Sequence, residues 1–148
     1  MKKNIILGII FIIFGFILGE LIFEDKIELI KKIKKGDTYY FLQEGVYKDY
    51  NNIQNNLNEI SKKIIERKKD KYYVYVGITK DQDVLEKLKK IYNKKNIVVY
   101  PKEVILSSRE FSTNVDQFDF LIKQTNDNDQ ILTIEEVVLS NYEEIVKK

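Results

Sequence analysis

The segment Tyr72–Gly77, which reads YYVYVG, decides the fold of this 148-residue chain. Tyrosine and valine alternate along it after a charged turn, which is typical of a β-strand that is half buried in a sheet. A helix pattern follows, because Asp81 can cap a helix whose apolar residues recur at spacings of three and four. The segment therefore predicts a strand followed by a helix that packs on the sheet.

A similar unit occurs earlier in the chain. Gly45–Asp49 reads GVYKD and Gly77–Asp81 reads GITKD, and each copy lies between a strand pattern and a helix pattern. The first strand is expected over Thr38–Gln43, where three aromatic residues favour a pleated surface. Both copies begin with glycine, which at a strand end usually marks a turn with positive φ or a close approach. The middle of the chain therefore predicts two βα units with structural glycines.

The C-terminal part of the chain has a different pattern. Ile97–Tyr100 is expected to form a further strand, and Pro101 limits this strand to an edge position or to the end of the ladder. From Ser107 onward the pattern predicts two amphipathic helices joined by the polar turn Asn126–Asp129. We expect these helices to pack against the core domain. A separate hairpin that binds a partner protein is the alternative.

The N-terminal part predicts a membrane anchor. Ile5–Phe23 is apolar except for Glu20, and about 20 residues in a helix can cross a hydrocarbon layer roughly 30 Å thick. A cleaved signal peptide is the alternative, which the length of the apolar segment and the lack of a small-residue cleavage site disfavour. Lysines lie on both sides of the span, so charge alone leaves its orientation open.

The composition excludes several kinds of chemistry. The chain has no cysteine and no histidine, which removes disulfides, zinc sites built from these residues, and triads with an imidazole base. The formal net charge is only +2, so nucleic acid is not an expected partner. The glutamates Glu44, Glu66 and Glu103 occur singly, with no spacing that suggests glycoside hydrolysis. We therefore expect a binding protein and not an enzyme, with no metal and no cofactor.

The alternation of side chains along the strands predicts an aromatic surface. If the helices of the βα units cover the face with Leu42, Val74 and Val76, the other face presents aromatic rings and one amide. Such a face suits a flat ligand with CH-rich surfaces and hydroxyl groups. The predicted binding residues are Tyr39, Phe41, Gln43, Tyr73, Tyr75 and Tyr100. The alternative is that these are ordinary sheet aromatics, covered by the C-terminal helices as a second core layer.

The segment from about Tyr39 to Lys102 resembles a SPOR domain, the peptidoglycan-binding module of bacterial division and sporulation proteins. The family pattern Gln-x-Gly-x-aromatic is matched by Gln43–Tyr47, and aromatic-x-Val-x-Val-Gly is matched by Tyr72–Gly77. The resemblance implies an α+β fold of the βαββαβ type, like that of ferredoxin and RNP domains, with two helices behind a four-stranded antiparallel sheet. It also implies a strand near Lys63–Lys68 that forms a hairpin with Tyr72–Val76.

The resemblance also implies a function. SPOR domains bind glycan strands stripped of their stem peptides on the open sheet face, which makes Gln43 the best-supported contact. The family is usually membrane-anchored with this domain outside, which implies a cytoplasmic N-terminus and an extracytoplasmic C-terminal part. We therefore expect non-catalytic binding of peptidoglycan at division or sporulation sites. A membrane-anchored scaffold, whose C-terminal helices bind a partner and whose sheet is only structural, is the alternative.

These inferences divide the chain into four expected parts. The anchor covers residues 1–23 and a membrane-proximal helix or linker covers 24–37. The SPOR-like domain covers residues 38–105, and the C-terminal helical extension, with its possible protein partner, covers 106–148.

Overall fold

The computed structural model describes residues 36–147 of the chain. The predicted anchor over Ile5–Phe23 and nearly all of the membrane-proximal segment lie outside these residues. Within the described range, no helix has both the length and the apolar character needed to cross a membrane. The compact unit described below begins at Gly36.

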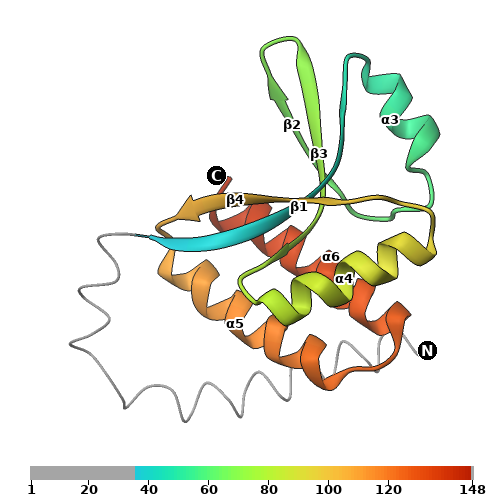
Figure 1. Cartoon of the computed structure of the whole chain (residues 1–148). Helices are drawn as coiled ribbons and strands as arrows, with labels where there is room; N and C mark the ends of the chain where they lie inside the picture. The colour runs from blue at the N-terminus through green and yellow to red at the C-terminus, as the bar shows by residue number, and fades with distance from the viewer. Residues whose placement is uncertain (1–35, 148) are drawn as a thin grey trace. The chain divides into compact units, whose positions relative to one another are not determined.

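The fold of the described residues is α+β, with a four-stranded antiparallel sheet and four helices (Figure 1). The sheet has the strand order β2-β3-β1-β4, so the strands of the two βα units are neighbours in its centre. In chain order the elements are β1 (Asp37–Tyr47), α3 (Tyr50–Asn56), β2 (Ile64–Lys68), β3 (Lys71–Thr79), α4 (Gln82–Lys94), β4 (Tyr100–Leu106), α5 (Arg109–Gln124) and α6 (Asn128–Ile145).

The two predicted βα units are confirmed, and aspartate caps the helix of each. The Asp49 side chain accepts a hydrogen bond from the backbone N–H of Asn51 at the start of α3. The Asp81 side chain accepts from the N–H groups of Asp83 and Val84 at the start of α4. Each cap satisfies donors that have no partner within the helix, which explains why the helices begin where they do.

The glycines of the two units do not form the turns that the sequence suggests, because both lie inside strands and neither has positive φ. Close approach explains them instead. A Cβ atom on Gly45 would lie 3.0 Å from the Tyr47 ring, and one on Gly77 would lie 3.2 Å from the Glu135 carboxylate. Glu135 is a buried residue of α6, so the absence of a side chain at Gly77 lets this helix pack closely against β3.

The strand implied near Lys63–Lys68 is present as β2. It pairs antiparallel with β3, from Ile64 opposite Tyr75 to Lys68 opposite Lys71. In Figure 1 the β2–β3 hairpin projects upward, away from α4, α5 and α6. The hairpin therefore carries part of the sheet beyond the helices.

The strand expected over Ile97–Tyr100 begins only at the last of these residues. Asn96 has a φ of 59°, and the N–H of Ile97 donates to the carbonyl of Tyr92, so this segment ends α4 before the chain becomes extended. β4 forms one edge of the sheet, where Pro101 lies opposite Leu42. The edge position predicted from the proline is confirmed.

Helices α5 and α6 pack on the sheet, as expected. The ring of Tyr39 in β1 stacks on Phe111 of α5, with centroids 5.4 Å apart. The ring of Phe41 meets Tyr142 of α6 edge-on at 5.2 Å. The C-terminal helices and the sheet therefore share one hydrophobic core, which extends across the boundary expected at residue 105.

The C-terminal half of β3 has β1 on one side only, because β2 pairs with no residue of β3 beyond Tyr75. Side chains of three helices satisfy the backbone groups on its other side. The Tyr92 hydroxyl of α4 donates to Val76 O at 2.6 Å, Ile78 N–H donates to Glu135 of α6 at 3.0 Å, and Lys80 N–H donates to Asp119 of α5 at 2.9 Å. These bonds fasten each helix to the same strand.

Candidate functional site

Most of the predicted aromatic surface lies under α5 and α6. Tyr39, Phe41 and Tyr75 are only 0%, 2% and 5% exposed. Burial raises the pKa of the Tyr39 hydroxyl to about 12. The prediction that these three side chains form an open face is therefore wrong. The physical reason is that the apolar stripes of α5 and α6 require a surface to cover, and this face of the sheet supplies it.

The amide of Gln43 is also largely covered, with 9% of the residue exposed. Gln43 pairs with Tyr100 of β4 on one side and with Tyr75 of β3 on the other. It therefore lies between a buried ring and an exposed one, at the border of the covered region.

Two of the predicted residues remain accessible beyond this border. Tyr100 is 59% exposed and Tyr73 is half-buried. The register places both on one face, because Tyr100 and Tyr75 both pair with Gln43, and Tyr73 and Tyr75 alternate along β3. Val46, opposite Tyr73, is exposed on the same face.

A cation lies above this surface. The ammonium group of Lys68 is 5.5 Å from the centroid of the Tyr73 ring and 2.9 Å from the Glu66 carboxylate. The hydrogen bond to Glu66 raises the pKa of Lys68. We call Val46, Lys68, Tyr73 and Tyr100 the exposed strip. It combines aromatic surface with a charged hydrogen-bond donor.

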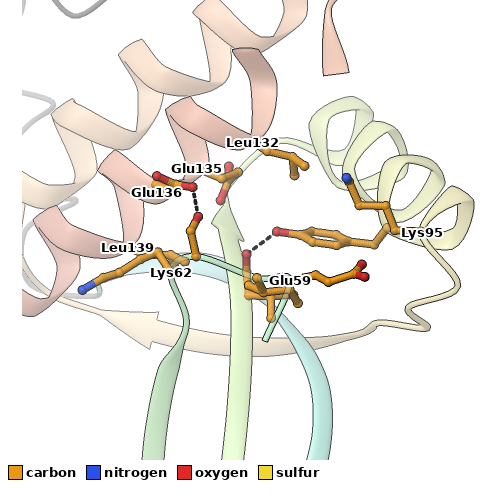
Figure 2. A pocket seen from close by; sticks show the side chains of 11 residues that line it. Glu59, Lys62, Lys95, Leu132, Glu135, Glu136 and Leu139 are labelled. Atoms are coloured by element: carbon orange, nitrogen blue, oxygen red, sulfur yellow. Dashed lines mark hydrogen bonds between the residues drawn. The ribbon is translucent and has the colours of Figure 1, made fainter. Parts of the chain in front are cut away.

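A cavity of about 60 Å³ lies between α4, α6 and the loop before β2 (Figure 2). Ile60, Val76, Leu132 and Leu139 are among the residues that form its walls. Glu135 also lines it, although this residue is only 1% exposed. Its second carboxyl oxygen, Oε1, has no hydrogen-bond partner among the described residues.

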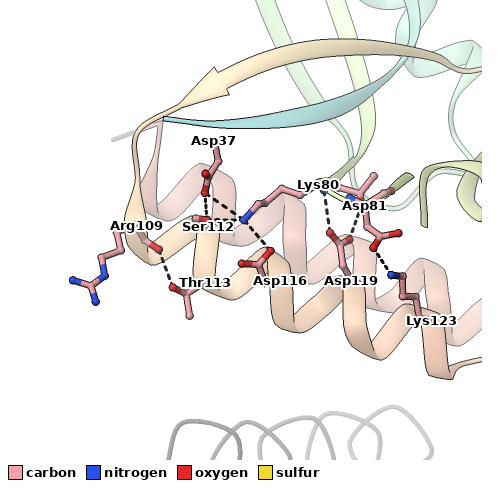
Figure 3. A network of polar contacts seen from close by, with 10 residues as sticks. Asp37, Lys80, Asp81, Arg109, Ser112, Thr113, Asp116, Asp119 and Lys123 are labelled. Atoms are coloured by element: carbon pink, nitrogen blue, oxygen red, sulfur yellow. Dashed lines mark hydrogen bonds and ion pairs between the residues drawn. The ribbon is translucent and has the colours of Figure 1, made fainter. Parts of the chain in front are cut away.

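A network of charged groups lies where β1 begins, β3 ends and α5 passes beneath them (Figure 3). The ammonium group of Lys80 is 3.3 Å from the Asp37 carboxylate and 2.8 Å from that of Asp116, and it donates to Ser112 at 2.7 Å. A third ion pair joins Lys123 of α5 to Asp81, the cap of α4. The network thus connects α5 to both βα units.

Asp119 is the buried member of this network. It accepts hydrogen bonds from the Thr79 hydroxyl at 2.6 Å and from the Lys80 N–H at 2.9 Å. Burial raises the pKa of the Asp119 carboxyl to about 6, although the bond from Thr79 lowers it. Residues 36–147 contain no group of three acidic side chains that could hold a metal ion. The arrangement therefore fastens α5 to the end of β3.

The two buried acids Asp119 and Glu135 were not predicted, although the sequence carries a signal for them. Glu135 follows Ile131 by four residues and precedes Leu139 by four, and Asp119 follows Val115 by four. Each acid therefore lies on the apolar stripe of its helix, where a side chain faces the core. An ionisable residue in that position needs partners, and here the backbone N–H groups of Ile78 in β3 and of Lys80, directly after β3, provide them.

No family model matches the chain, and neither does any curated protein or solved structure. The resemblance to SPOR domains thus stays a prediction from two short motifs.

Proposed function

We propose that the chain is a membrane-anchored, non-catalytic protein that binds the glycan of peptidoglycan through the exposed strip. The observation that carries this proposal is that Tyr100 is exposed and Tyr73 is only half-buried on one face of the sheet, beyond the area that α5 and α6 cover. The CH-rich faces of sugar rings pack on aromatic rings, and Lys68 is placed to donate to sugar hydroxyl groups.

The element order supports the same proposal. From β1 to β4 the order is strand, helix, strand, strand, helix, strand, which is the ferredoxin-like βαββαβ order that the SPOR resemblance implies. The binding surface differs from the expected one, because Tyr39, Phe41 and Tyr75 are covered. The strip offers fewer rings than an open sheet, so we expect weak binding that several anchored copies would strengthen.

A sedimentation assay tests this function. The full chain in detergent micelles is mixed with sacculi that an amidase has stripped of stem peptides, and the fraction that sediments is measured. We expect the double variant Tyr73→Ala/Tyr100→Ala to bind about 5- to 150-fold more weakly, since two lost ring contacts at about 0.5–1.5 kcal/mol each sum to about 1–3 kcal/mol.

Tyr50→Ala is the matched control. Tyr50 is exposed, and its ring contacts Tyr72, whose side chain lies on the opposite face of β3 from Tyr73. This control should bind like the unmodified chain. Equal binding by the folded double variant would exclude the strip, and no binding by any form would exclude glycan as the ligand.

A protein partner is the second candidate, favoured by Phe120, which is 54% exposed on α5. A scaffold could use this ring as its contact. Crosslinking in cells tests the idea: Phe120→Asp should abolish a specific crosslinked partner while binding to sacculi persists. If Phe120→Asp leaves the crosslinked partner unchanged, the exposed face of α5 is not the partner surface.

A further inference from the structure

The tip of the β2–β3 hairpin places positive charge at one end of the exposed strip. Residues 68–71 form this tip and read KKDK, and all four are exposed. Lys68 and Lys71 lie opposite each other in the last pair of the ladder. Because side chains alternate along β3, Lys71 lies on the same face as Tyr73. The lysines therefore border an aromatic ring of the proposed glycan surface.

Two features of this tip oppose the stability of the hairpin. Lys68 and Lys71 are like charges directly opposite each other, an arrangement that destabilises a sheet. Lys69 has a φ of 54°, although glycine is the residue that suits positive φ in a two-residue hairpin turn. Backbone strain of this kind concentrates at functional sites. Stability does not explain these lysines, so we looked for a ligand that uses their charge.

Two of the three ammonium groups have no acidic partner. Lys68 is 2.9 Å from the Glu66 carboxylate, which shows that a carboxylate can reach an ammonium group at this tip. None of the ion pairs within residues 36–147 includes Lys69 or Lys71. Ammonium groups form their strongest hydrogen bonds with carboxylates and phosphates. The tip therefore suits an anionic ligand.

A glycan without stem peptides carries such groups. In peptidoglycan each stem peptide is joined by an amide bond to the lactyl carboxyl group of an N-acetylmuramic acid. Hydrolysis of this bond by an amidase releases the peptide and leaves a free carboxylate on the sugar. A stripped strand is therefore an anion, and its charges complement the lysines of the tip.

We propose that Lys69 and Lys71 bind the carboxylates that removal of the stem peptides leaves on the glycan, while Tyr73 and Tyr100 contact the sugar rings. This inference rests on the proposed function and adds the chemical group that marks a stripped strand. An intact strand has a neutral amide at the same position, which offers no charge to the lysines.

Sedimentation with stripped sacculi at low ionic strength tests the proposal. Hydrofluoric acid first removes phosphodiester polymers from the sacculi, and the full chain is used in detergent micelles. Lys69→Gly/Lys71→Gln should bind about 2- to 30-fold more weakly, which is the effect of losing two exposed ion pairs. The glycine relieves the strained φ of the turn, so weaker binding would not result from unfolding.

Lys90→Gln/Lys94→Gln is the matched control, because it removes the same charge from exposed positions of α4. Neither of these lysines belongs to an ion pair within residues 36–147. In Figure 1 the hairpin projects away from α4. The control should therefore bind like the unmodified chain.

A chemical change of the glycan tests the same contact from the other side. Carbodiimide and ammonia convert the carboxylates of stripped sacculi into neutral amides. The unmodified chain should bind these sacculi as weakly as Lys69→Gly/Lys71→Gln binds the untreated ones. The amidation should leave the binding of the lysine variant unchanged.

Three results would overturn the proposal while Tyr73→Ala/Tyr100→Ala still weakens binding, so that the proposed function stands. The lysine variant could bind stripped sacculi like the unmodified chain, or amidation could leave binding by the unmodified chain unchanged. An effect of the lysines that disappears once phosphodiester polymers are removed would identify phosphate as the ligand. If no form of the chain binds stripped sacculi, the proposed function fails, and this inference fails with it.

Discussion

Replacing Asp119 by asparagine should remove a large part of the pH dependence of stability. The pKa of this carboxyl is raised in the folded protein to about 6, against an ordinary value of 3.8. One pKa unit corresponds to about 1.4 kcal/mol, so the shift corresponds to about 3 kcal/mol. A group with a raised pKa in the folded state contributes stability that is complete below pH 3.8 and is lost as the pH rises through 6.

Asparagine suits this test because it can keep both hydrogen bonds of Asp119. Its carbonyl oxygen can accept from the Lys80 N–H, and its NH₂ group can donate to the Thr79 hydroxyl oxygen. Asp119→Asn should therefore fold, and its stability relative to the unmodified chain should rise by about 3 kcal/mol between about pH 4 and pH 7.

Urea unfolding of both forms, followed by tyrosine fluorescence at several pH values, measures this difference. Thr79→Val tests the direction of the pKa shift separately. The Thr79 hydroxyl lowers the pKa of Asp119, so removing this hydroxyl should raise that pKa further. NMR titration of the Asp119 carboxyl would show the change directly. A difference between the two forms that stays constant within about 0.5 kcal/mol across the pH range would refute the assignment.

Three further predictions concern stability, each measured as the free energy of urea unfolding. Phe41→Ala should lower it by about 3–5 kcal/mol, because the ring packs between those of Tyr75 and Tyr142, and a negligible loss would contradict this core position. Gly77→Ala should lower it by about 1–3 kcal/mol, because the new Cβ would lie 3.2 Å from Glu135. An unchanged free energy of unfolding would show that α6 can move to make room. Lys69→Gly should raise it by about 0.5–1 kcal/mol, because φ is 54° there, and a loss would show that the turn relies on the lysine.

The strand patterns could be predicted because alternation and helix caps are local properties. Tyr72–Gly77 alternates clearly, and Asp49 and Asp81 directly precede the helices that they cap. β2 reads IIERK, which has little alternation, and only the resemblance to a known fold indicated it. Local signals therefore explain most of the elements.

The covered face could not be predicted, because alternation separates two faces without showing which one is buried. Leu42 and Val74 lie on one apolar face of the sheet, and Tyr39 and Phe41 lie on the other. By composition, either face could be the one that further helices cover. The apolar stripes of α5 and α6 showed that a further layer was available. Only the tertiary structure shows where that layer packs.

The side chains that occupy the free edge of β3 have a consequence for association between chains. An open strand edge is a template for pairing with a strand of another molecule. Here Tyr92, Asp119 and Glu135 already occupy backbone groups along that edge, so an incoming strand finds these groups taken. Any loosening of α5 and α6 would uncover this edge together with the aromatic core. The same bonds that hold the helices in place thus also protect the protein from aggregation.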